Sequence, residues 1–304
     1  MEGHPEFSRK IVGKLGVIFG FKCNFSCAHC LTYRENSTKI AETELNAVAD
    51  AIDHYRVRNI HFTGGEPTLY LKEVHSLLSR IRVNRQATVR ITTNGHFAST
   101  EAAARRLLSS IPRLKYVQLS YDKFHKKFLP FNNLRNIFAV CRELGVDFCC
   151  NLTIQSPMDL VLLTELRRAG KFPVLIQKVS AIGEAKRNGL AYAPPAFDKK
   201  LLARRCPNRN NLVYIFGRGF SACCSSLLFN GRYDWLCNKS PEAYLESDFY
   251  KFICGNTFKG IAGKLSVPIS ELLPEHSSPC GLCEKLFVSH FGKPGPKVFP
   301  VVTK

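Results

Sequence analysis

Short stretches in which polar and apolar residues alternate recur along the chain, and segments with apolar residues at helical spacing separate them. In residues 87–93 and 115–121 alternate side chains are apolar, which predicts strands with one apolar and one polar face. In residues 41–56, Leu45, Val48 and Ile52 fall on one side of a helix. The whole pattern predicts strands at 11–20, 58–63, 87–93, 115–121, 146–154 and 173–180, and helices at 41–56, 71–83, 100–110, 133–144 and 158–169.

Six strands that alternate with helices predict an α/β fold with a parallel sheet and right-handed crossovers. The alternate positions of four strands are largely polar: Asn59, His61 and Thr63; Thr88, Arg90, Thr92 and Asn94; Gln118, Ser120 and Asp122; Asp147, Cys149, Asn151 and Thr153. A closed eight-stranded barrel packs branched apolar residues inside. We therefore expect an open, partial (β/α)6 TIM-like barrel, with its apolar faces on the helices, a polar cavity inside, and the chemistry at the strand ends.

The pattern changes after Pro194 and Pro195. We divide the chain into a partial barrel at 11–195, a small cysteine-rich domain at 196–292 and a mobile basic tail at 293–304. Neither a signal peptide nor an apolar run of the roughly 18 residues of a membrane span is present in the sequence. Thirteen cysteines, an odd number in a long chain, favour reduced thiols and metal ligation over disulfides. We expect a cytoplasmic protein without a membrane partner.

The formal net charge is +19, from 43 Lys and Arg against 24 Asp and Glu. Such a surplus favours an anionic partner, for example a phosphate-bearing or carboxylate-rich small molecule, an acidic peptide or RNA. Because the basic residues are spread along the chain, a generally basic and solvated surface explains the charge equally well.

The stretch 21–35, reading FKCNFSCAHCLTYRE, contains the most specific motif. Cys23, Cys27 and Cys30 are spaced C-x3-C-x2-C, so one loop can bring three thiolates to three irons of a four-iron cluster and leave the fourth iron open. A structural zinc site is the alternative, but it needs a fourth ligand, and only His29 lies nearby. With a strand before it and FTGGEP after it, this motif resembles the radical S-adenosylmethionine (SAM) enzymes.

The resemblance implies a [4Fe-4S] cluster on the three cysteines, whose open iron chelates SAM, and a one-electron donor such as flavodoxin or ferredoxin. Cleavage of SAM in that family gives a 5'-deoxyadenosyl radical that takes a hydrogen atom from the substrate. The residues that match the family's SAM contacts are His29, Gly64, Gly65, Glu66, Pro67, Asn94, Ser120 and Asp122. A helix cap is the alternative role for Asp122. Residues 182–185 resemble a segment that touches the adenine, with Glu184 where an arginine is common.

A second cysteine set lies beyond residue 195. Cys206 and Cys224 flank Gly219 in the C-x12-G-x4-C spacing of radical SAM enzymes with SPASM or twitch extensions, and Cys280 and Cys283 follow as C-x2-C. The resemblance implies one auxiliary [4Fe-4S] cluster on these four cysteines, because the further cysteines of a full SPASM pattern are missing from the sequence. A zinc ribbon on the same four is the alternative.

We interpret the chain as a radical SAM enzyme that abstracts a hydrogen atom from a polar metabolite or a peptide residue, with epimerisation or dehydrogenation as the outcome. Cys223, left over beside Cys224, is the candidate catalytic thiol, which would return a hydrogen atom to the substrate radical. Core packing is its alternative role. A radical SAM enzyme that modifies RNA and a non-catalytic iron-sulfur regulator are the alternative functions, although nucleic acid is not the partner that we expect.

Overall fold

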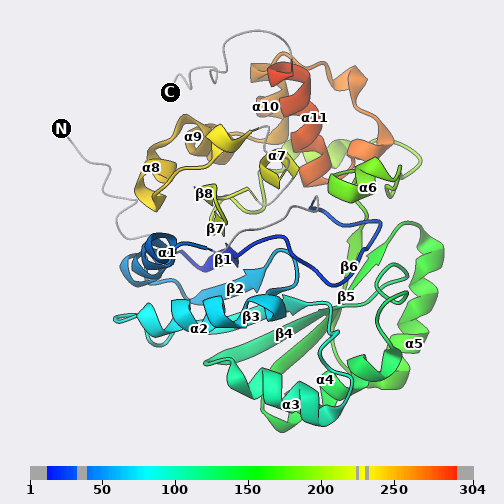
Figure 1. The fold of residues 1–304 in the computed structure, drawn as a ribbon. Helices are drawn as coiled ribbons and strands as arrows, with labels where there is room; N and C mark the ends of the chain where they lie inside the picture. The colour runs from blue at the N-terminus through cyan, green and yellow to red at the C-terminus, as the bar shows by residue number, and fades with distance from the viewer. Residues whose placement is uncertain (1–11, 33–39, 224–225, 230–232, 293–304) are drawn as a thin grey trace.

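One mixed sheet organises the computed structural model, which describes residues 12–32, 40–223, 226–229 and 233–292 (Figure 1). Its strand order is β6-β5-β4-β3-β2-β1-β7-β8; the pairs from β6 to β7 are parallel, and β7 with β8 is antiparallel. The strands are β1 (Lys14–Ile18), β2 (Asn59–Thr63), β3 (Thr88–Thr93), β4 (Leu114–Ser120), β5 (Asp147–Ile154), β6 (Val174–Lys178), β7 (Leu212–Ile215) and β8 (Gly219–Ser221).

Helices follow the first six strands, and Figure 1 shows the first five of these helices around the outside of the sheet. They are α1 (Glu42–His54), α2 (Leu71–Arg80), α3 (Glu101–Ser110), α4 (Phe131–Glu143), α5 (Leu162–Ala169) and the short α6 (Gly183–Arg187). The remaining helices lie together above β7 and β8: α7 (Ser226–Phe229), α8 (Pro241–Glu246), α9 (Asp248–Gly255), α10 (Phe258–Lys264) and α11 (Pro279–Phe291).

The predicted partial (β/α)6 barrel is confirmed, because each of its six strands and five helices forms within a few residues of the predicted bounds. Alternation accounts for this success. On β2 and β3 the apolar residues Ile60, Phe62, Val89 and Ile91 are all buried against the helices. Gly145, at φ +64, follows the end of α4 as predicted, in the left-handed conformation that favours glycine.

The region beyond residue 195 extends the same sheet. β7 pairs with β1 in parallel register, with Leu15 opposite Leu212 and Ile18 opposite Ile215. Buried residues of β7 and β8, among them Tyr214, belong to the same hydrophobic core as the barrel. The division at residue 195 stays a prediction, and the sheet and core run across it. The predicted tail at 293–304 lies outside the described residues.

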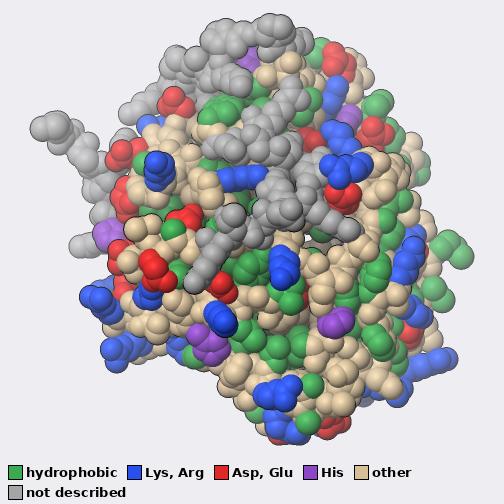
Figure 2. Space-filling model, viewed as in Figure 1, with side chains coloured by type: hydrophobic (Ala, Val, Ile, Leu, Met, Phe, Trp, Pro, Cys, Tyr) green, Lys and Arg blue, Asp and Glu red, His purple; other side chains and the backbone are tan. Residues whose placement is uncertain are grey.

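The surface is mixed in character. Lys and Arg side chains are scattered over the face in Figure 2, in keeping with a generally basic surface. The sheet ends at β6, where the apolar Leu175 and Ile176 are 42% and 51% exposed. Among the described helices, none combines the length and apolar character needed to cross a membrane.

Phe62 tests how much the buried face of the sheet contributes to stability. Its ring is fully buried and stacks on Phe19 with centroids 5.5 Å apart. Phe62→Ala should reduce the free energy of unfolding by about 3–5 kcal/mol, because it removes buried area and leaves a cavity. Val83 is 74% exposed, so Val83→Ala is the control and should change the free energy by less than about 0.5 kcal/mol. Denaturant unfolding measures both, and equal losses would contradict the assignment of the core.

Candidate active site

The segment after β1, residues 19–32, crosses the carboxyl end of the sheet, and we call it the cysteine loop. The turn after β2 packs directly against it. Gly65 N–H donates to the Gly20 carbonyl at 3.1 Å, and Glu66 N–H donates to the Lys22 carbonyl at 2.8 Å. A Cβ on Gly65 would lie 2.2 Å from the Lys22 carbonyl oxygen. Because Gly65 has no Cβ, the turn and the cysteine loop can approach each other this closely.

Gly64 and Pro67, which flank Gly65 and Glu66 in the motif, are also fixed by packing. Gly64 has φ +121, and a Cβ there would lie 2.6 Å from Cγ2 of Ile18. Pro67 is buried and begins a short 3-10 turn that leads into α2. The turn is thus shaped by packing, and the predicted contacts of its residues with SAM stay predictions.

Glu66 ties the ends of β2 and β3 together. Its side chain is almost fully buried, and its carboxylate accepts from Thr68 N–H at 3.1 Å and from the Thr68 hydroxyl at 2.7 Å. It also accepts from the Thr93 hydroxyl at 2.7 Å and from Asn94 N–H at 2.8 Å. Burial raises the pKa of Glu66, although these hydrogen bonds act in the opposite direction. A substitution here would therefore disturb the turn as well as any contact with SAM.

Asn94, at the end of β3, contacts the cysteine loop beside its first thiol. Its Nδ2 donates to Oδ1 of Asn24 at 2.7 Å and lies 3.6 Å from Sγ of Cys23. The same sulfur accepts from Phe25 N–H at 3.4 Å. Burial raises the pKa of the Cys23 thiol to about 11, so in the free protein it is protonated at neutral pH. Hydrogen-bond donors around a sulfur suit a ligating thiolate, which a metal would hold deprotonated.

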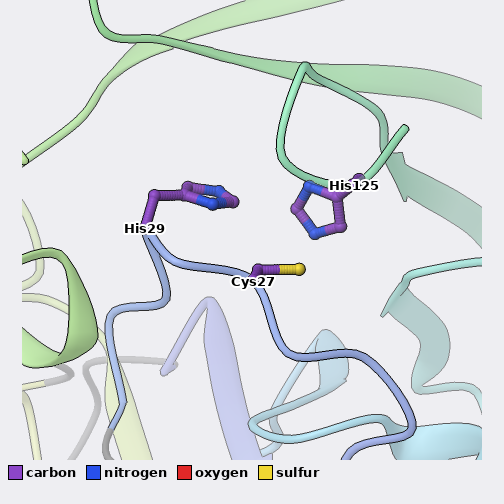
Figure 3. Close-up of side chains that lie close together, drawn as sticks. All are labelled: Cys27, His29 and His125. Atoms are coloured by element: carbon purple, nitrogen blue, oxygen red, sulfur yellow. The ribbon is translucent and has the colours of Figure 1, made fainter. Parts of the chain in front are cut away.

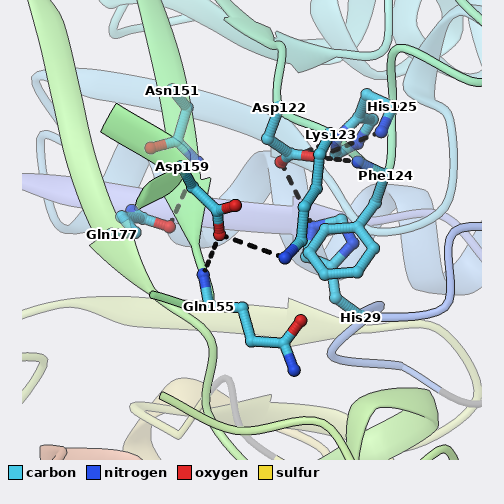
Figure 4. Close-up of polar contacts among 9 residues, drawn as sticks. All are labelled: His29, Asp122, Lys123, Phe124, His125, Asn151, Gln155, Asp159 and Gln177. Carbon is cyan, nitrogen blue, oxygen red and sulfur yellow. Dashed lines mark hydrogen bonds and ion pairs between the residues drawn. The ribbon is translucent and has the colours of Figure 1, made fainter. Parts of the chain in front are cut away.

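Asp122, beyond β4, anchors the other side of the loop (Figure 4). Its fully buried carboxylate accepts from the N–H groups of Phe124 and His125 at 2.9 and 3.0 Å, and from Nδ1 of His125 at 2.9 Å. Nε2 of His29 lies 3.4 Å away. Burial raises the pKa of Asp122, but the two histidines outweigh it and hold the pKa well below its usual range. These bonds cap a turn rather than a helix, because the next helix, α4, begins only at Phe131, and the ribose contact stays a prediction.

His29 lies with one ring face covered. Its ring stacks on Phe124 with centroids 4.3 Å apart and planes inclined by 20°. The side chain is largely buried, and the predicted packing of His29 on adenine would have to use the remaining face. That contact stays a prediction.

The segment after β6 also contacts the cysteine loop. Glu184 N–H donates to the Cys30 carbonyl at 2.9 Å, and Nδ2 of Asn188 donates to the Ala28 carbonyl at 3.1 Å. Gly183, at φ +59, lies so close that a Cβ would be 2.3 Å from the backbone of the loop. The cysteine loop is therefore held at the ends of β2, β3, β4 and β6.

One group of side chains tests the zinc alternative. Cys27, His29 and His125 have ligand atoms within 4.8 Å of one another, and no other such group of three occurs in the described part of the chain (Figure 3). Cys23 and Cys30 lie outside this group, so a zinc ion there would use one cysteine of the motif and still need a fourth ligand. A four-iron cluster needs one thiolate for each of three irons. Three thiols on one loop, close enough for Cys27 and Cys30 to contribute to the raised pKa of Cys23, fit that requirement.

Inside the barrel, polar side chains form bonds between neighbouring strands, as the alternation predicted. The pairs are His61 Nε2 with the Thr92 hydroxyl at 2.7 Å, Asn151 Nδ2 with Gln177 Oε1 at 3.1 Å, and Arg90 with Gln118. Ser120 lies opposite Asn151 in the register of β4 and β5. The amide oxygen of Asn151 is buried and has no hydrogen-bond partner among the described residues. This interior can therefore accept a hydrogen bond from a polar ligand.

Three cysteines of the second set, Cys206, Cys280 and Cys283, lie near one another and near Cys223 in the C-terminal region. Burial raises the pKa of the Cys283 thiol well above its ordinary value, and the nearby Cys223, Cys206 and Cys280 add to the rise. The Cys206 sulfur accepts from the backbone N–H groups of the two residues that follow Pro207, which oppose the effect of burial on its pKa. Cys224, the remaining predicted ligand, lies outside the described residues.

Cys254, at the end of α9, lies beside the same set, and sequence reasoning gave it no role. Its thiol donates to the Arg209 carbonyl at 3.4 Å, and its own carbonyl accepts from Nη1 of Arg205 at 3.0 Å. Burial raises the pKa of the Cys254 thiol to about 12, with Cys206 contributing. No motif could have found it, because its spacing matches neither the C-x12-G-x4-C nor the C-x2-C pattern.

The segment after β6, which contacts the cysteine loop, also contacts the helix that carries Cys280 and Cys283. A cavity of about 400 Å³ lies between α6 and α11, and Lys186 and the buried Glu284 form an ion pair in its wall at 2.9 Å. The hydroxyl of Ser180 donates to that of Ser278 at 3.1 Å. The segment that holds the Cys30 carbonyl is thus coupled to the helix that carries Cys280 and Cys283.

The family of the barrel follows from comparison with known sequences. The model of the radical SAM superfamily matches residues 17–156, from β1 through the end of β5. Residues 17–156 form a radical SAM domain. The chain accordingly contains a radical SAM domain, and the cofactors of that superfamily are a [4Fe-4S] cluster and SAM.

Curated relatives match only part of this chain. It is 37% identical over 90 residues to GTP 3',8-cyclase from Ectopseudomonas mendocina (strain ymp), covering 28% of this chain and 27% of the relative. It is 34% identical over 105 residues to GTP 3',8-cyclase 2 from Pseudomonas aeruginosa, covering 31% of each. The chain therefore spans less than a third of the length of these relatives.

A solved structure is similar in fold over most of the chain. The crystal structure of BtrN in complex with AdoMet and 2-DOIA aligns with a TM-score of 0.52, covering 83% of this chain and 89% of BtrN, at 16% identity. At this identity the comparison shows the shared partial-barrel fold.

Gly65 tests whether the turn after β2 positions the cysteine loop. Gly65→Ala would force a Cβ against the Lys22 carbonyl, so the loop or the turn must move. We expect anaerobically reconstituted Gly65→Ala protein to lose about four irons per chain. A Cβ added to Gly13 would meet no atom within 4 Å, so Gly13→Ala is the matched control and should keep full iron content. Iron analysis that finds normal loading of Gly65→Ala would show that the contact does not position the loop.

Proposed function

We propose that this radical SAM enzyme takes a hydrogen atom from a polar substrate held inside the barrel. When bound, the cluster and SAM supply the 5'-deoxyadenosyl radical that takes the hydrogen atom. The observation that supports a polar substrate best is the hydrogen-bonding interior of the sheet. The buried amide oxygen of Asn151 is an acceptor that a hydroxyl or N–H group of the substrate would satisfy.

Different residues in and around the cysteine loop would hold the cluster and SAM. Cys23, Cys27 and Cys30 ligate three irons. The turn after β2 and Asn94 would contact the amino-acid part of SAM, and Ser120 lies at the strand end near the expected ribose. The buried Asp122 acts here by fixing the turn that carries His125 and Phe124 against His29.

The second cysteine set supports an auxiliary [4Fe-4S] cluster as part of the proposal. Cys206, Cys280 and Cys283 provide three ligands, and Cys224 is the predicted fourth. With this cluster as acceptor, the substrate radical would lose one electron to it and one proton to solvent, giving a product two hydrogens lighter. Without such transfer, a thiol hydrogen atom returned to the opposite face would give an epimer.

Cys223 is the proposed hydrogen-atom donor for the epimerisation route. It is partly exposed and lies near Cys283. When its S–H bond breaks and a C–H bond forms, a thiyl radical remains, which one electron from the external donor and one solvent proton restore to the thiol. The proximity of Cys223 to Cys283 also makes it a competing ligand, so the two roles must be separated by experiment.

A nucleotide is a second candidate substrate class. The curated relatives that match part of the chain are named for a reaction of GTP. The net charge of +19 is also suited to a phosphate-bearing substrate. Ring formation within a nucleotide would then replace epimerisation or dehydrogenation as the outcome.

Iron content tests the two-cluster proposal. Anaerobically reconstituted protein should bind about eight irons per chain, and simultaneous replacement of Cys23, Cys27 and Cys30 by Ala should leave about four, because each cluster contains four. Replacement of Cys206, Cys280 and Cys283 should also leave about four. One zinc with four irons in the unsubstituted protein would refute the auxiliary cluster.

Solvent deuterium distinguishes the outcomes. In deuterated water, epimerisation through Cys223 should give a product with one solvent deuterium, because a thiol exchanges its hydrogen with solvent. Cys223→Ala should lose that product while SAM is still cleaved, and Cys141→Ala is a control because Cys141 is a buried core thiol on α4. A dehydrogenated product together with fully active Cys223→Ala protein would rule out the donor role, and mass spectrometry reads both results.

A further inference from the structure

Arg90 points into the barrel from the middle of β3, where its neighbours hold the guanidinium in place. Tyr116 is its register partner on β4, and the Arg90 Cζ lies 4.1 Å from the centroid of the Tyr116 ring. Nη2 of Arg90 donates to Oε1 of Gln118, a buried side chain one layer further along β4. The guanidinium is thus stacked on an aromatic ring and hydrogen-bonded through Nη2, which fixes its orientation.

The charge of Arg90 has no counter-charge in contact. In the parts of the chain that the structure describes, no carboxylate oxygen lies within 4.0 Å of its guanidinium nitrogens. Its Nε is buried and has no hydrogen-bond partner there. A positive group turned inward without a counter-charge, and with one N–H unsatisfied, is unfavourable unless an anion or water satisfies it.

The titratable groups that face Arg90 do not neutralise it. Burial, with smaller contributions from Lys14 and Arg90, lowers the pKa of His61, its register partner on β2, to about 3, so His61 is neutral. Burial and a hydrogen bond with Cys149 raise the pKa of Tyr116 to about 12, so the phenol is neutral too. Burial also raises the pKa of the Cys149 thiol.

One carboxylate acts on this region from a distance. Asp147, the register partner of Tyr116 on β5, contributes to the raised pKa of the phenol. It is exposed at the start of its strand, where solvent screens its charge. Lys14, at the start of β1, adds a second positive charge near His61. The two charges that act on His61 are therefore both positive.

We propose that Arg90 binds an oxyanion of the substrate, a phosphate or a carboxylate, inside the barrel. This inference rests on the proposed function and names the substrate class: a polar molecule with an anionic group at the end away from the reacting carbon. The Nε–H and the N–H groups not used by Gln118 form the donor fork that suits an oxyanion. Gln118 and Tyr116 are positioning residues, since they act through the guanidinium.

Oxyanion binding by the reconstituted protein tests the proposal with simple probes. Isothermal titration with inorganic phosphate and pyrophosphate forms one arm, and titration with acetate and succinate forms the other. We expect saturable binding in one arm, which identifies phosphate or carboxylate. Arg90→Gln should weaken that binding at least tenfold, and Arg90→Lys should weaken it less, because lysine keeps the charge and loses the fork.

A matched control separates this site from general surface charge. Arg135 also lies over an aromatic ring, 4.9 Å from the Phe131 centroid, but on the exposed side of α4. Arg135→Gln removes the same charge and should leave the affinity unchanged. Gln118→Ala keeps both arginines and should weaken binding severalfold, so the test does not depend on one variant being able to fold.

Two results would contradict the proposed oxyanion site. One is that none of the four probes binds saturably, and the other is that Arg90→Gln and unsubstituted protein bind the probe with equal affinity. Reductive cleavage of SAM without substrate is measured in the same samples. It should be the same in Arg90→Gln and unsubstituted protein, because Arg90 holds substrate rather than SAM. Failure of the unsubstituted protein to cleave SAM would refute the proposed function and leave the oxyanion result to be judged separately.

Discussion

The hydrogen bonds between the cysteine loop and the carboxyl ends of the strands are the constraint on which the rest of the site depends. The loop has no regular secondary structure of its own, so its backbone polar groups need partners elsewhere. The carbonyls of Gly20, Lys22 and Cys30 find them in the turns after β2 and β6. Three thiols can therefore be held apart at fixed positions by a loop of about a dozen residues, which is what a cluster with one open iron requires.

This constraint also explains the buried acidic groups near the loop. Glu66 and Asp122 both sit at strand ends with their carboxylates occupied by donors of the chain itself. Glu66 joins two strands, and Asp122 holds the turn whose histidine and phenylalanine rings lie against His29. Further into the barrel the polar groups are less completely matched, as the free edges of Arg90 and Asn151 show. The polar groups around the cysteine loop thus have their hydrogen-bond partners within the chain. Groups deeper in the barrel, where a substrate would lie, can still form further hydrogen bonds.

Much of the barrel could be predicted from sequence because alternation along β2 to β5 marks one face apolar and the other polar. The cysteine and glycine motifs could also be found from sequence, because each is a set of residues at close, fixed spacing. The contact between the two motifs could not be predicted, because Gly65 and Lys22 are far apart in the sequence and meet only in the fold. β7 was missed because its four residues, all buried, show no alternation. Cys254 received no predicted role because tertiary contacts with Arg205 and Arg209 place it, and such contacts leave no spacing signal.

We propose that the cysteine loop holds a four-iron cluster with one iron open to SAM. Electron paramagnetic resonance of the reduced, reconstituted protein tests it most directly, in a variant with Cys206, Cys280 and Cys283 replaced so that a second cluster cannot contribute. We expect a four-iron signal that changes when SAM is added, because SAM enters the coordination of the open iron. A signal unaffected by SAM, or zinc in place of iron on Cys23, Cys27 and Cys30, would contradict it.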